Sequence, residues 1–431
     1  MTIAEEQVAP PAVPATPAAP PRRSRLARVG NYLVSANQVT VAFYGLAIAL
    51  VVGGVMLTFT TPPTLHALAT LFDHPGASLS TIFSTIGDTY RDLFTGSIVD
   101  PTALGHSITT NQGWVLTFTP LTQTLAQATP LIIAGLGIGI GFETGVFNIG
   151  GASQVTLGAA CACYVGVDVS MPAPWHVLAC ILAGIAGGAI GGAIPGVLKA
   201  FTGAHEVITT IMLNYAVGSL LLWDLQTPWL ALQAPNQGNT ISKTLPSSAG
   251  FPQLFGPNLP LNVGLPIALG AVVLAWWILD RSTMGFRFRI TGASPNAART
   301  AGIDAKRTTI LVLIVSGAFV GLAGTVQLIG LDRYMTWGGP QGYATGIGFT
   351  AITVALIGRN RPFGILCGAI LIGALNWGAF NVESAANIST DLTSIIQAVM
   401  LLCIATPAAI AKIFHLRQGT SATFNFSGWG G

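Results

Sequence analysis

The chain has 431 residues, of which 51% are hydrophobic and only 8% charged, and its mean hydropathy is +0.66. Apolar runs of about 20 residues, the length of a membrane-crossing helix, recur along it, which excludes an ordinary water-soluble multidomain protein. The net charge of +3 is too small to indicate nucleic-acid binding. Composition therefore predicts an all-α fold, a polytopic bundle of transmembrane helices.

The chain begins with a tail, residues 1–30, that is rich in proline and alanine and ends in four arginines. Such a segment cannot bury a core, so we expect it to be disordered and cytoplasmic. No small-residue cleavage site follows, so the first apolar run is expected to be a helix and not a signal peptide. Ten spans are expected, near 39–59, 121–141, 152–169, 174–198, 206–224, 263–280, 307–330, 344–358, 362–380 and 392–411.

The distribution of cations orients this bundle, because cytoplasmic loops carry an excess of Lys and Arg. With ten spans and the N-terminus inside, only Arg91, Lys243 and Arg333 of the 18 Lys and Arg fall outside. A wrong number of spans would scatter the cations, so both termini are expected in the cytoplasm. The expected membrane domain then covers 31–417, followed by a cytoplasmic tail at 418–431.

Two stretches, 60–117 and 225–262, are long and external in this arrangement. In the first, apolar residues between Leu79 and Phe94 recur with the period of an amphipathic helix. Such a helix lies on the membrane surface or on the rim of the protein. It serves either as a structural cap or as part of a docking surface for an external partner.

The cations are concentrated in one cytoplasmic loop, residues 281–306, and at its junction with the next span. Together these hold six of the 18 Lys and Arg: Arg281, Arg287, Arg289, Arg299, Lys306 and Arg307. This loop is either an ordinary basic loop held by lipid headgroups or a segment that binds a cytoplasmic partner. The charges alone leave both alternatives open.

A short helix is predicted inside this loop. Ser294 suits the N-cap, Pro295 the first helical position, and Gly302 the left-handed C-terminal cap. Good helix formers, among them Ala297, Ala298 and Arg299, lie between them. Two turns are far fewer than the roughly 12–15 residues that an isolated helix needs in water, so this helix requires a partner.

The motif Asn296-Ala297-Ala298-x-x-x-Gly302 resembles the EAA-type loop of ABC importer permeases, with Asn296 where many members carry Glu. Four further motifs occur in order: Phe147-Asn148-Ile149-Gly150, His205-Glu206-Val207-Ile208, Met212-Leu213-Asn214-Tyr215 and Ser316-Gly317-Ala318-Phe319-x-Gly321-Leu322-Ala323-Gly324. Together they resemble the nucleoside and simple-sugar branch of the family that includes ribose and branched-chain amino acid permeases. The resemblance covers about residues 115–411. One departure is FNIGGASQ at 147–154, where this branch often reads FNIGAEGQ.

The resemblance implies a permease subunit of an ATP-driven importer in the bacterial plasma membrane. It would carry a nucleoside or simple sugar delivered by an extracytoplasmic binding lipoprotein. The implied partners are an ABC ATPase and a second permease, with a heterodimer expected. In that family the loop is a coupling helix, so Ser294, Pro295, Asn296, Ala297, Ala298, Arg299 and Gly302 would couple this chain to the ATPase.

No GxxxxGK[ST] motif, catalytic set or metal-ligand cluster is present in the sequence, so we expect no enzyme activity and no bound cofactor in this chain. ATP and Mg²⁺ would then be used by the partner ATPase. The alternatives are a permease for another small polar solute, such as a branched-chain amino acid, or an ion-coupled secondary transporter. The latter usually carries more ionisable residues at mid-membrane.

Polar residues within the expected spans are candidates for the translocation path, because a buried amide in hydrocarbon needs a partner. These are Asn148, Gln154, Asn214 and Tyr215, which either contact the solute or form hydrogen bonds between helices. Glu143 is expected at the cytoplasmic mouth beside a basic neighbour. Glu206 opens a helix, where the dipole favours a carboxylate, so gating and structural roles compete.

Overall fold

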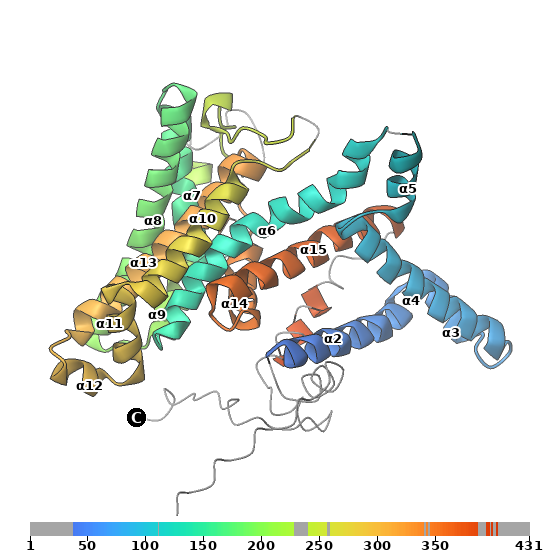
Figure 1. The fold of residues 1–431 in the computed structure, drawn as a ribbon, viewed down its shortest axis with the longest axis horizontal. Coiled ribbons are helices and arrows are strands. Elements are labelled where there is room, and N and C mark those ends of the chain that lie inside the picture. Colours follow the sequence, from blue (N-terminus) through green and yellow to red (C-terminus); the bar gives the residue numbers. More distant parts are fainter. Residues whose placement is uncertain are drawn as a thin grey trace, which may run out of the picture.

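The computed structural model describes residues 38–110, 112–227, 240–256, 259–339, 342–343, 345–386, 394–396, 398–399 and 402–403. The predicted tails at 1–30 and 418–431, and most of the expected span at 392–411, lie outside these residues. In the described part the regular structure is helical, apart from the isolated bridges Ile241–Thr336 and Gln253–Asn262. Figure 1 shows the arrangement of the helices.

Seven helices of the described part are long and apolar enough to cross a membrane. They are α2 (Gln38–Thr60), α6 (Trp114–Glu143), α8 (Ala173–Thr202), α9 (Glu206–Gln226), α10 (Gly264–Trp276) with η2 (Trp277–Arg281), α13 (Ala305–Gln327) with η3 (Leu328–Asp332), and α15 (Pro362–Ala386). Each coincides with an expected span. The protein is therefore a multi-pass membrane protein.

Two further helices occupy expected spans but do not meet this standard. The helix α7 (Gly151–Asp168) has 18 residues, and polar side chains such as Gln154 lower its hydropathy. The helix α14 (Thr345–Ile357) has 13 residues, fewer than the about 20 that a full crossing needs. Both pack inside the bundle, against α6 and against each other, so protein contacts replace lipid around much of their surface.

The first long loop is also helical. It forms α3 (Pro62–Ala69), α4 (Pro75–Ser97) and α5 (Pro101–Thr110), and α4 carries the amphipathic pattern predicted from the sequence. Ile82 and Leu93 of α4 are buried, whereas Phe83 on the same helix is exposed. The buried side packs along α15, where the amide of Asn381 donates to the carbonyl of Gly96 at 3.2 Å.

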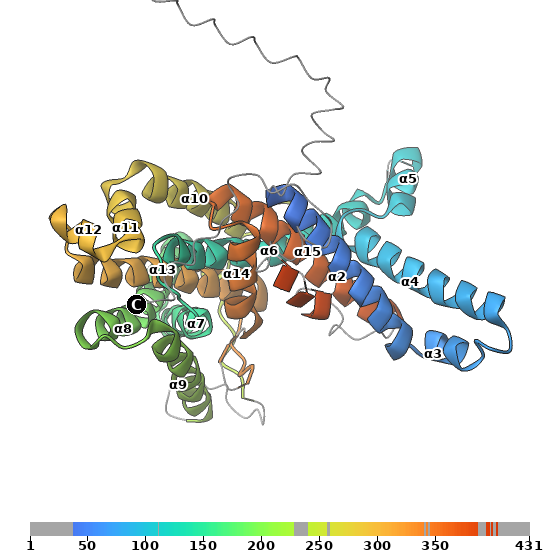
Figure 2. The same cartoon turned by 90° about the horizontal axis from the view of Figure 1, so that it is seen from below.

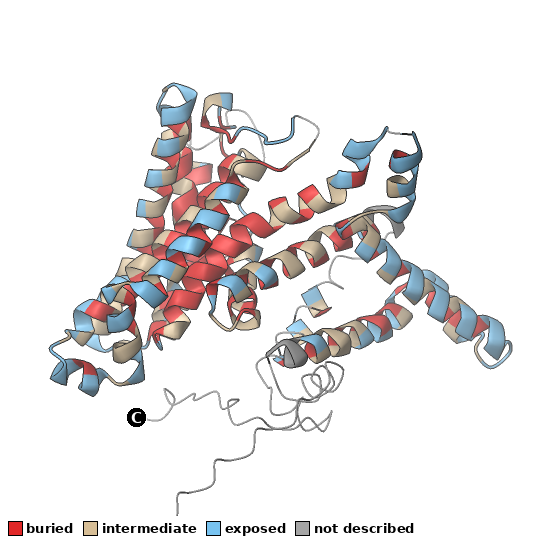
Figure 3. Ribbon diagram, in the orientation of Figure 1, coloured by how far each residue is buried: buried red, intermediate tan, exposed pale blue. Residues whose placement is uncertain are grey.

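The core lies where α6, α7, α8 and α13 meet, and buried residues are concentrated there in Figure 3. The helices α8 and α13 approach through glycines spaced four residues apart, including Gly184, Gly188 and Gly192 on α8. A Cβ on Gly188 would lie 2.3 Å from the carbonyl oxygen of Gly317 on α13, so no side chain fits. Small residues allow this backbone contact, which provides dispersion attraction in a lipid environment.

The two ends of α13 mark the two poles of the molecule. At its beginning lie Lys306 and Arg307, close to α11 (Thr283–Ala293) and α12 (Pro295–Thr300). At its other end, Arg333 has a left-handed backbone (φ 65°) and donates from Nη2 to the carbonyl of Pro246 at 3.1 Å. Arg333 thus joins the end of α13 to the loop after residue 240. Figure 2 shows α9 at one edge of the bundle, beside α7 and α8.

Candidate functional site

The short helix predicted in the basic loop is present as α12. The Ser294 hydroxyl accepts from the backbone N–H of Ala297 at 3.2 Å, and Pro295 begins the helix. At its end, Gly302 has a φ of 74° and donates to the carbonyl of Arg299, while Ile303 donates to that of Ala298 at 2.9 Å. These two bonds form a Schellman cap, the termination that a glycine at this position favours.

The side chains of α12 divide among three directions. Ala298 is fully buried against its own chain, which anchors the helix. Pro295 and Arg299, four residues apart, line a cavity between α12 and the bundle. Asn296 and Ala297 are exposed and do not line that cavity, so they form an outward face available to another protein.

The helix α11, which precedes α12, rests on the segment between α6 and α7. A Cβ on Gly292 would lie 2.5 Å from the carbonyl oxygen of Thr144, so α11 and this segment touch backbone to backbone. At its other end, α11 begins at an N-cap in which Ser282 accepts from Gly285 at 3.1 Å. A displacement of α12 would therefore reach residues 144–150 through one short, closely packed helix.

A cluster of charges surrounds the end of α6. Asp280 lies 3.6 Å from a guanidinium nitrogen of Arg289 and 3.7 Å from one of Arg361. Glu143, the last residue of α6, lies within electrostatic range of the same two arginines. The predicted basic neighbours of Glu143 are thus present, and they come from α11 and from the turn between α14 and α15.

Three of the four polar residues proposed for the translocation path form one buried network. Asn148, Gln154 and Asn214 are almost completely buried. The Nδ2 of Asn148 donates to Gln154 Oε1 at 2.9 Å and to Ser316 Oγ at 2.8 Å. Gln154 Nε2 and the N–H of Gly150 donate in turn to Asn148 Oδ1, at 3.1 and 3.0 Å.

Asn214 extends this network to α9. It accepts from the N–H of Ser153 at 2.9 Å and donates to the carbonyl of Ile149 at 3.0 Å. Tyr215, the next residue, faces the other way and is 45% exposed. The network thus joins α7, α9 and α13 around residues 147–154, whereas Tyr215 faces the surroundings of the bundle. A solute-contacting role for these four residues stays a prediction.

Glu206, at the start of α9, is paired with the end of α8. Its carboxylate lies 2.7 Å from the ammonium of Lys199, and His205 is 4.0 Å away. The pair closes the turn at 203–205 between the two helices. This geometry accounts for Glu206 as a structural residue, and its predicted gating role is untested.

A second polar cavity, of about 390 Å³, lies toward the pole that carries Arg333. Its lining comes mainly from α6, α13 with η3, α14, α15 and the loop at 343, and its polar members include Gln127, Gln327, Asp332, Tyr343 and Asn376. Gln327 donates to both carboxylate oxygens of Asp332, at 3.0 and 3.1 Å, and the Tyr343 hydroxyl donates to Oδ2. Burial, and then the charge of Asp332, raise the pKa of Tyr343 well above its usual value, so this hydroxyl remains a donor.

Sequence reasoning missed this cavity, which is called the outer cavity after the expected orientation of the bundle. Gln327 and Asp332 follow a long apolar run, and Asn376 lies within another. A search for amides and carboxylates both within spans and at their ends would have found each residue, but not their proximity. In the described residues, no group of three or more His, Cys, Asp or Glu side chains is placed to hold a metal ion.

A family model described as "Branched-chain amino acid transport system / permease component" matches residues 121–405. The chain belongs to this family. The permease is thus a membrane-spanning component of a transport system, and the matched region contains the core helices, both polar cavities and the loop at 281–306. The matched region begins within α6, so α2, α3, α4 and α5 lie outside it.

Curated relatives indicate which group of permeases within the family the chain resembles. The permease is 33% identical over 288 residues to the guanosine ABC transporter permease protein NupP of Bacillus subtilis, covering 67% of this chain and 81% of that protein. It is 32% identical over 306 residues to the nucleoside ABC transporter permease protein NupB of Lactococcus lactis (70% and 83%). It is also 32% identical over 304 residues to the glucose ABC transporter permease protein TsgB13 of Haloferax volcanii, covering 66% of this chain and 76% of that protein.

These matches confirm the resemblance to the nucleoside and simple-sugar branch of ABC importer permeases. No solved structure gives a significant match to the chain.

Proposed function

We propose that the chain is the transmembrane subunit of an ATP-driven importer for a nucleoside or a simple sugar. The observation that carries this proposal is the outward face of α12, an exposed, capped, two-turn helix next to a cationic loop, in a permease whose relatives are named for guanosine, nucleoside and glucose transport. ATP and Mg²⁺ are bound by a separate ATPase seated on this face. The membrane is the bacterial plasma membrane.

The second proposed partner is another permease chain. Bacillus subtilis has two proteins named guanosine ABC transporter permease, NupP and NupQ, which are 33% and 27% identical to this chain. Lactococcus lactis likewise has NupB and NupC, which are 32% and 24% identical to it. Two unequal relatives in one organism support a heterodimer. An extracytoplasmic lipoprotein delivers the solute at the pole that carries Arg333.

The solute route begins at the outer cavity. Amide, hydroxyl and carboxylate groups suit the hydroxyls of a sugar or ribose, and the described lining contains no Lys or Arg to neutralise a solute carboxylate. That composition supports a neutral polyol over a branched-chain amino acid as the solute. The buried network at 148–154 then lies between this cavity and the coupling loop.

The coupling proposal is tested at Ala297. Replacing Ala297 by Glu puts a charge on the outward face, where we expect it to reduce uptake by about tenfold or more while ATP hydrolysis by the assembled complex continues. Ala297→Ser is the matched control and retains uptake. Ala298 is unsuitable for this test because it is buried inside its own chain. Normal uptake with Ala297→Glu would reject α12 as the coupling helix.

A further inference from the structure

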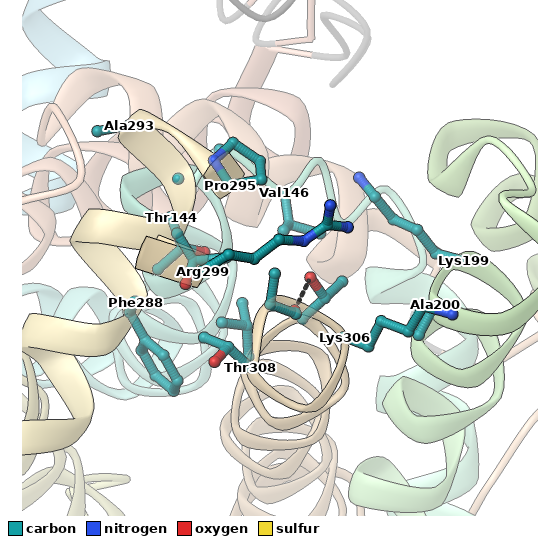
Figure 4. Close-up of a pocket in the computed structure, with 16 residues that line it drawn as sticks. Thr144, Val146, Lys199, Ala200, Phe288, Ala293, Pro295, Arg299, Lys306 and Thr308 are labelled. Atoms are coloured by element: carbon teal, nitrogen blue, oxygen red, sulfur yellow. Dashed lines mark hydrogen bonds between the residues drawn. The ribbon is translucent and has the colours of Figure 1, made fainter. Parts of the chain in front are cut away.

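The cavity behind α12 has a composition that coupling to an ATPase does not explain. It has a volume of about 450 Å³ and is lined by α12, α11, the beginning of α13, the end of α8 and the turn at 144–146. Figure 4 shows the side chain of Arg299 extending from α12 into this space, toward the side that carries Lys199. Cavities of this size hold small molecules, since ligand pockets measure roughly 300–1,000 Å³.

The lining carries three cations and no carboxylate among the described residues: Lys199, Arg299 and Lys306. Lys199 is already paired with Glu206 at 2.7 Å, whereas Asp304, 3.3 Å from Arg307, forms no ion pair with Arg299 or Lys306 in the described structure. The ammonium of Lys306 lies 5.8 Å from the ring centroid of Phe201. Within the described structure Arg299 has no hydrogen bond and no ion pair, so an excess of positive charge faces the cavity.

One lining hydroxyl independently points to a ligand. The Oγ1 of Thr291, on α11, is buried and has no hydrogen-bond partner in the described structure. A buried polar atom without a partner costs free energy, and native proteins rarely leave one unsatisfied. A hydroxyl donor beside two cations outside any described ion pair, Arg299 and Lys306, is a set of groups that an oxyanion satisfies.

We propose that this cavity binds the phosphate group of a small, soluble phosphate ester from the cytoplasm. Arg299 and Lys306 hold its oxygens by charge-assisted hydrogen bonds, and Thr291 donates one more. The outward face of α12, with Asn296 and Ala297, stays available to the ATPase because it is separate from this cavity. The ligand thus occupies the space between α12 and the bundle and does not compete with the ATPase.

Such a ligand would regulate transport. Arg299 belongs to α12, Thr291 to α11 and Lys306 to α13, so one bound phosphate connects the coupling helix to the core helix α13. A coupling helix fixed in this way cannot move when the ATPase changes conformation. Uptake therefore slows when the ester accumulates inside the cell. This regulatory consequence rests on the coupling function proposed above, whereas the binding itself does not.

Binding is measured by equilibrium dialysis of labelled glycerol 3-phosphate against the full-length chain in phosphatidylcholine nanodiscs, with glycerol as the neutral control. We expect saturable binding of one glycerol 3-phosphate per chain and none of glycerol. Lys306→Gln should weaken it by about tenfold or more and Thr291→Val by about fivefold, because hydrogen bonds to charged groups are the stronger ones. Arg307→Gln removes the same charge one residue away, outside the cavity, and should change the affinity less than about twofold.

The site would be overturned by the absence of saturable binding, or by equal losses of affinity for glycerol 3-phosphate in Lys306→Gln and Arg307→Gln. It would also be overturned if phosphatidic acid added to the nanodiscs displaced glycerol 3-phosphate, because the site would then belong to a lipid headgroup. Thermal unfolding confirms that each variant is folded, and Arg299→Gln replaces any that is not. In proteoliposomes with the ATPase, internal glycerol 3-phosphate should slow wild-type uptake and leave that of Lys306→Gln unaffected. Equal slowing of both would remove the regulatory role, and an inactive complex would leave the binding result intact.

Discussion

The Nδ2 of Asn148 donates a hydrogen bond of 2.8 Å to the Oγ of Ser316, 168 positions further along the chain. Both residues are fully buried. This bond fastens the irregular segment between α6 and α7 to the middle of α13. The same segment touches α11 through Thr144, so the loop at 281–306 and the core network meet within a few residues.

Removing Asn148 should therefore destabilise the fold. Asn148→Leu leaves the side chains of Gln154 and Ser316 and the N–H of Gly150 without this partner, at about 1–3 kcal/mol for each buried group. We expect a clearly lower unfolding temperature for the detergent-solubilised protein, followed by tryptophan fluorescence. Tyr215→Phe, at an exposed position, should unfold as the wild type does. An unchanged unfolding temperature together with lost solute binding would instead make Asn148 a solute ligand.

The glycine contact between α8 and α13 should tolerate no side chain. In Gly188→Ala the new methyl group would lie 2.3 Å from the carbonyl oxygen of Gly317, so the helices must separate. We expect a loss of about 1–3 kcal/mol or more, seen as a lower yield of folded protein in size-exclusion chromatography. Gly270→Ala on α10 is the control, because nothing lies within 4 Å of the added Cβ. Equal yields for the two variants would show that α8 and α13 are not in backbone contact.

Asp332 should determine solute affinity at the outer cavity. Asp332→Asn keeps the shape of the side chain but removes the charge that accepts from Gln327 and Tyr343. We expect the KM for guanosine or glucose uptake, whichever the complex carries, to rise by about tenfold, as for the loss of one charged hydrogen bond. Asp168→Asn, at the exposed end of α7, should leave the KM unchanged. A fall in the maximal rate with an unchanged KM would contradict solute contact.

Variants of Glu206 and Lys199 distinguish a structural role of Glu206 from a gating role, because the first affects stability and the second affects uptake. Glu206→Gln removes the partner of Lys199 and should cost about 1 kcal/mol of stability. The double variant Lys199→Glu with Glu206→Lys should recover part of that loss, though not all, since a cation is unfavourable at the N-terminus of α9. Stability is read from thermal unfolding. Full stability of Glu206→Gln with abolished uptake would favour gating.

Local features of the fold were predictable because their causes lie within a few residues. Ser294, Pro295 and Gly302 set the two ends of α12 by capping chemistry, and the apolar run after Glu206 sets the extent of α9. The face of α12 that Ala298 occupies was not predictable, since two turns provide no clear hydrophobic period. Burial of Ala298 depends on where α11 places the helix.

The cavities were not predictable, because they depend on contacts between distant segments. The outer cavity brings Gln127, Asp332 and Asn376 together from three helices. The cavity behind α12 brings together Lys199 and Lys306, which the sequence showed only as members of an expected cytoplasmic excess of cations. Charge counts predict which pole a residue occupies, but not which side chains share a hollow there.

The glycine contact between α8 and α13 also has a consequence for biosynthesis. The helix α8 leaves the ribosome well before α13, because α9, α10, α11 and α12 are made in between. Until α13 enters the bilayer, lipid must fill the shallow groove over Gly184, Gly188 and Gly192, or a neighbouring nascent helix must shield it. A chain interrupted in this interval would leave this groove, with its exposed backbone, uncovered in the bilayer. We expect membrane quality-control proteases to degrade such a chain.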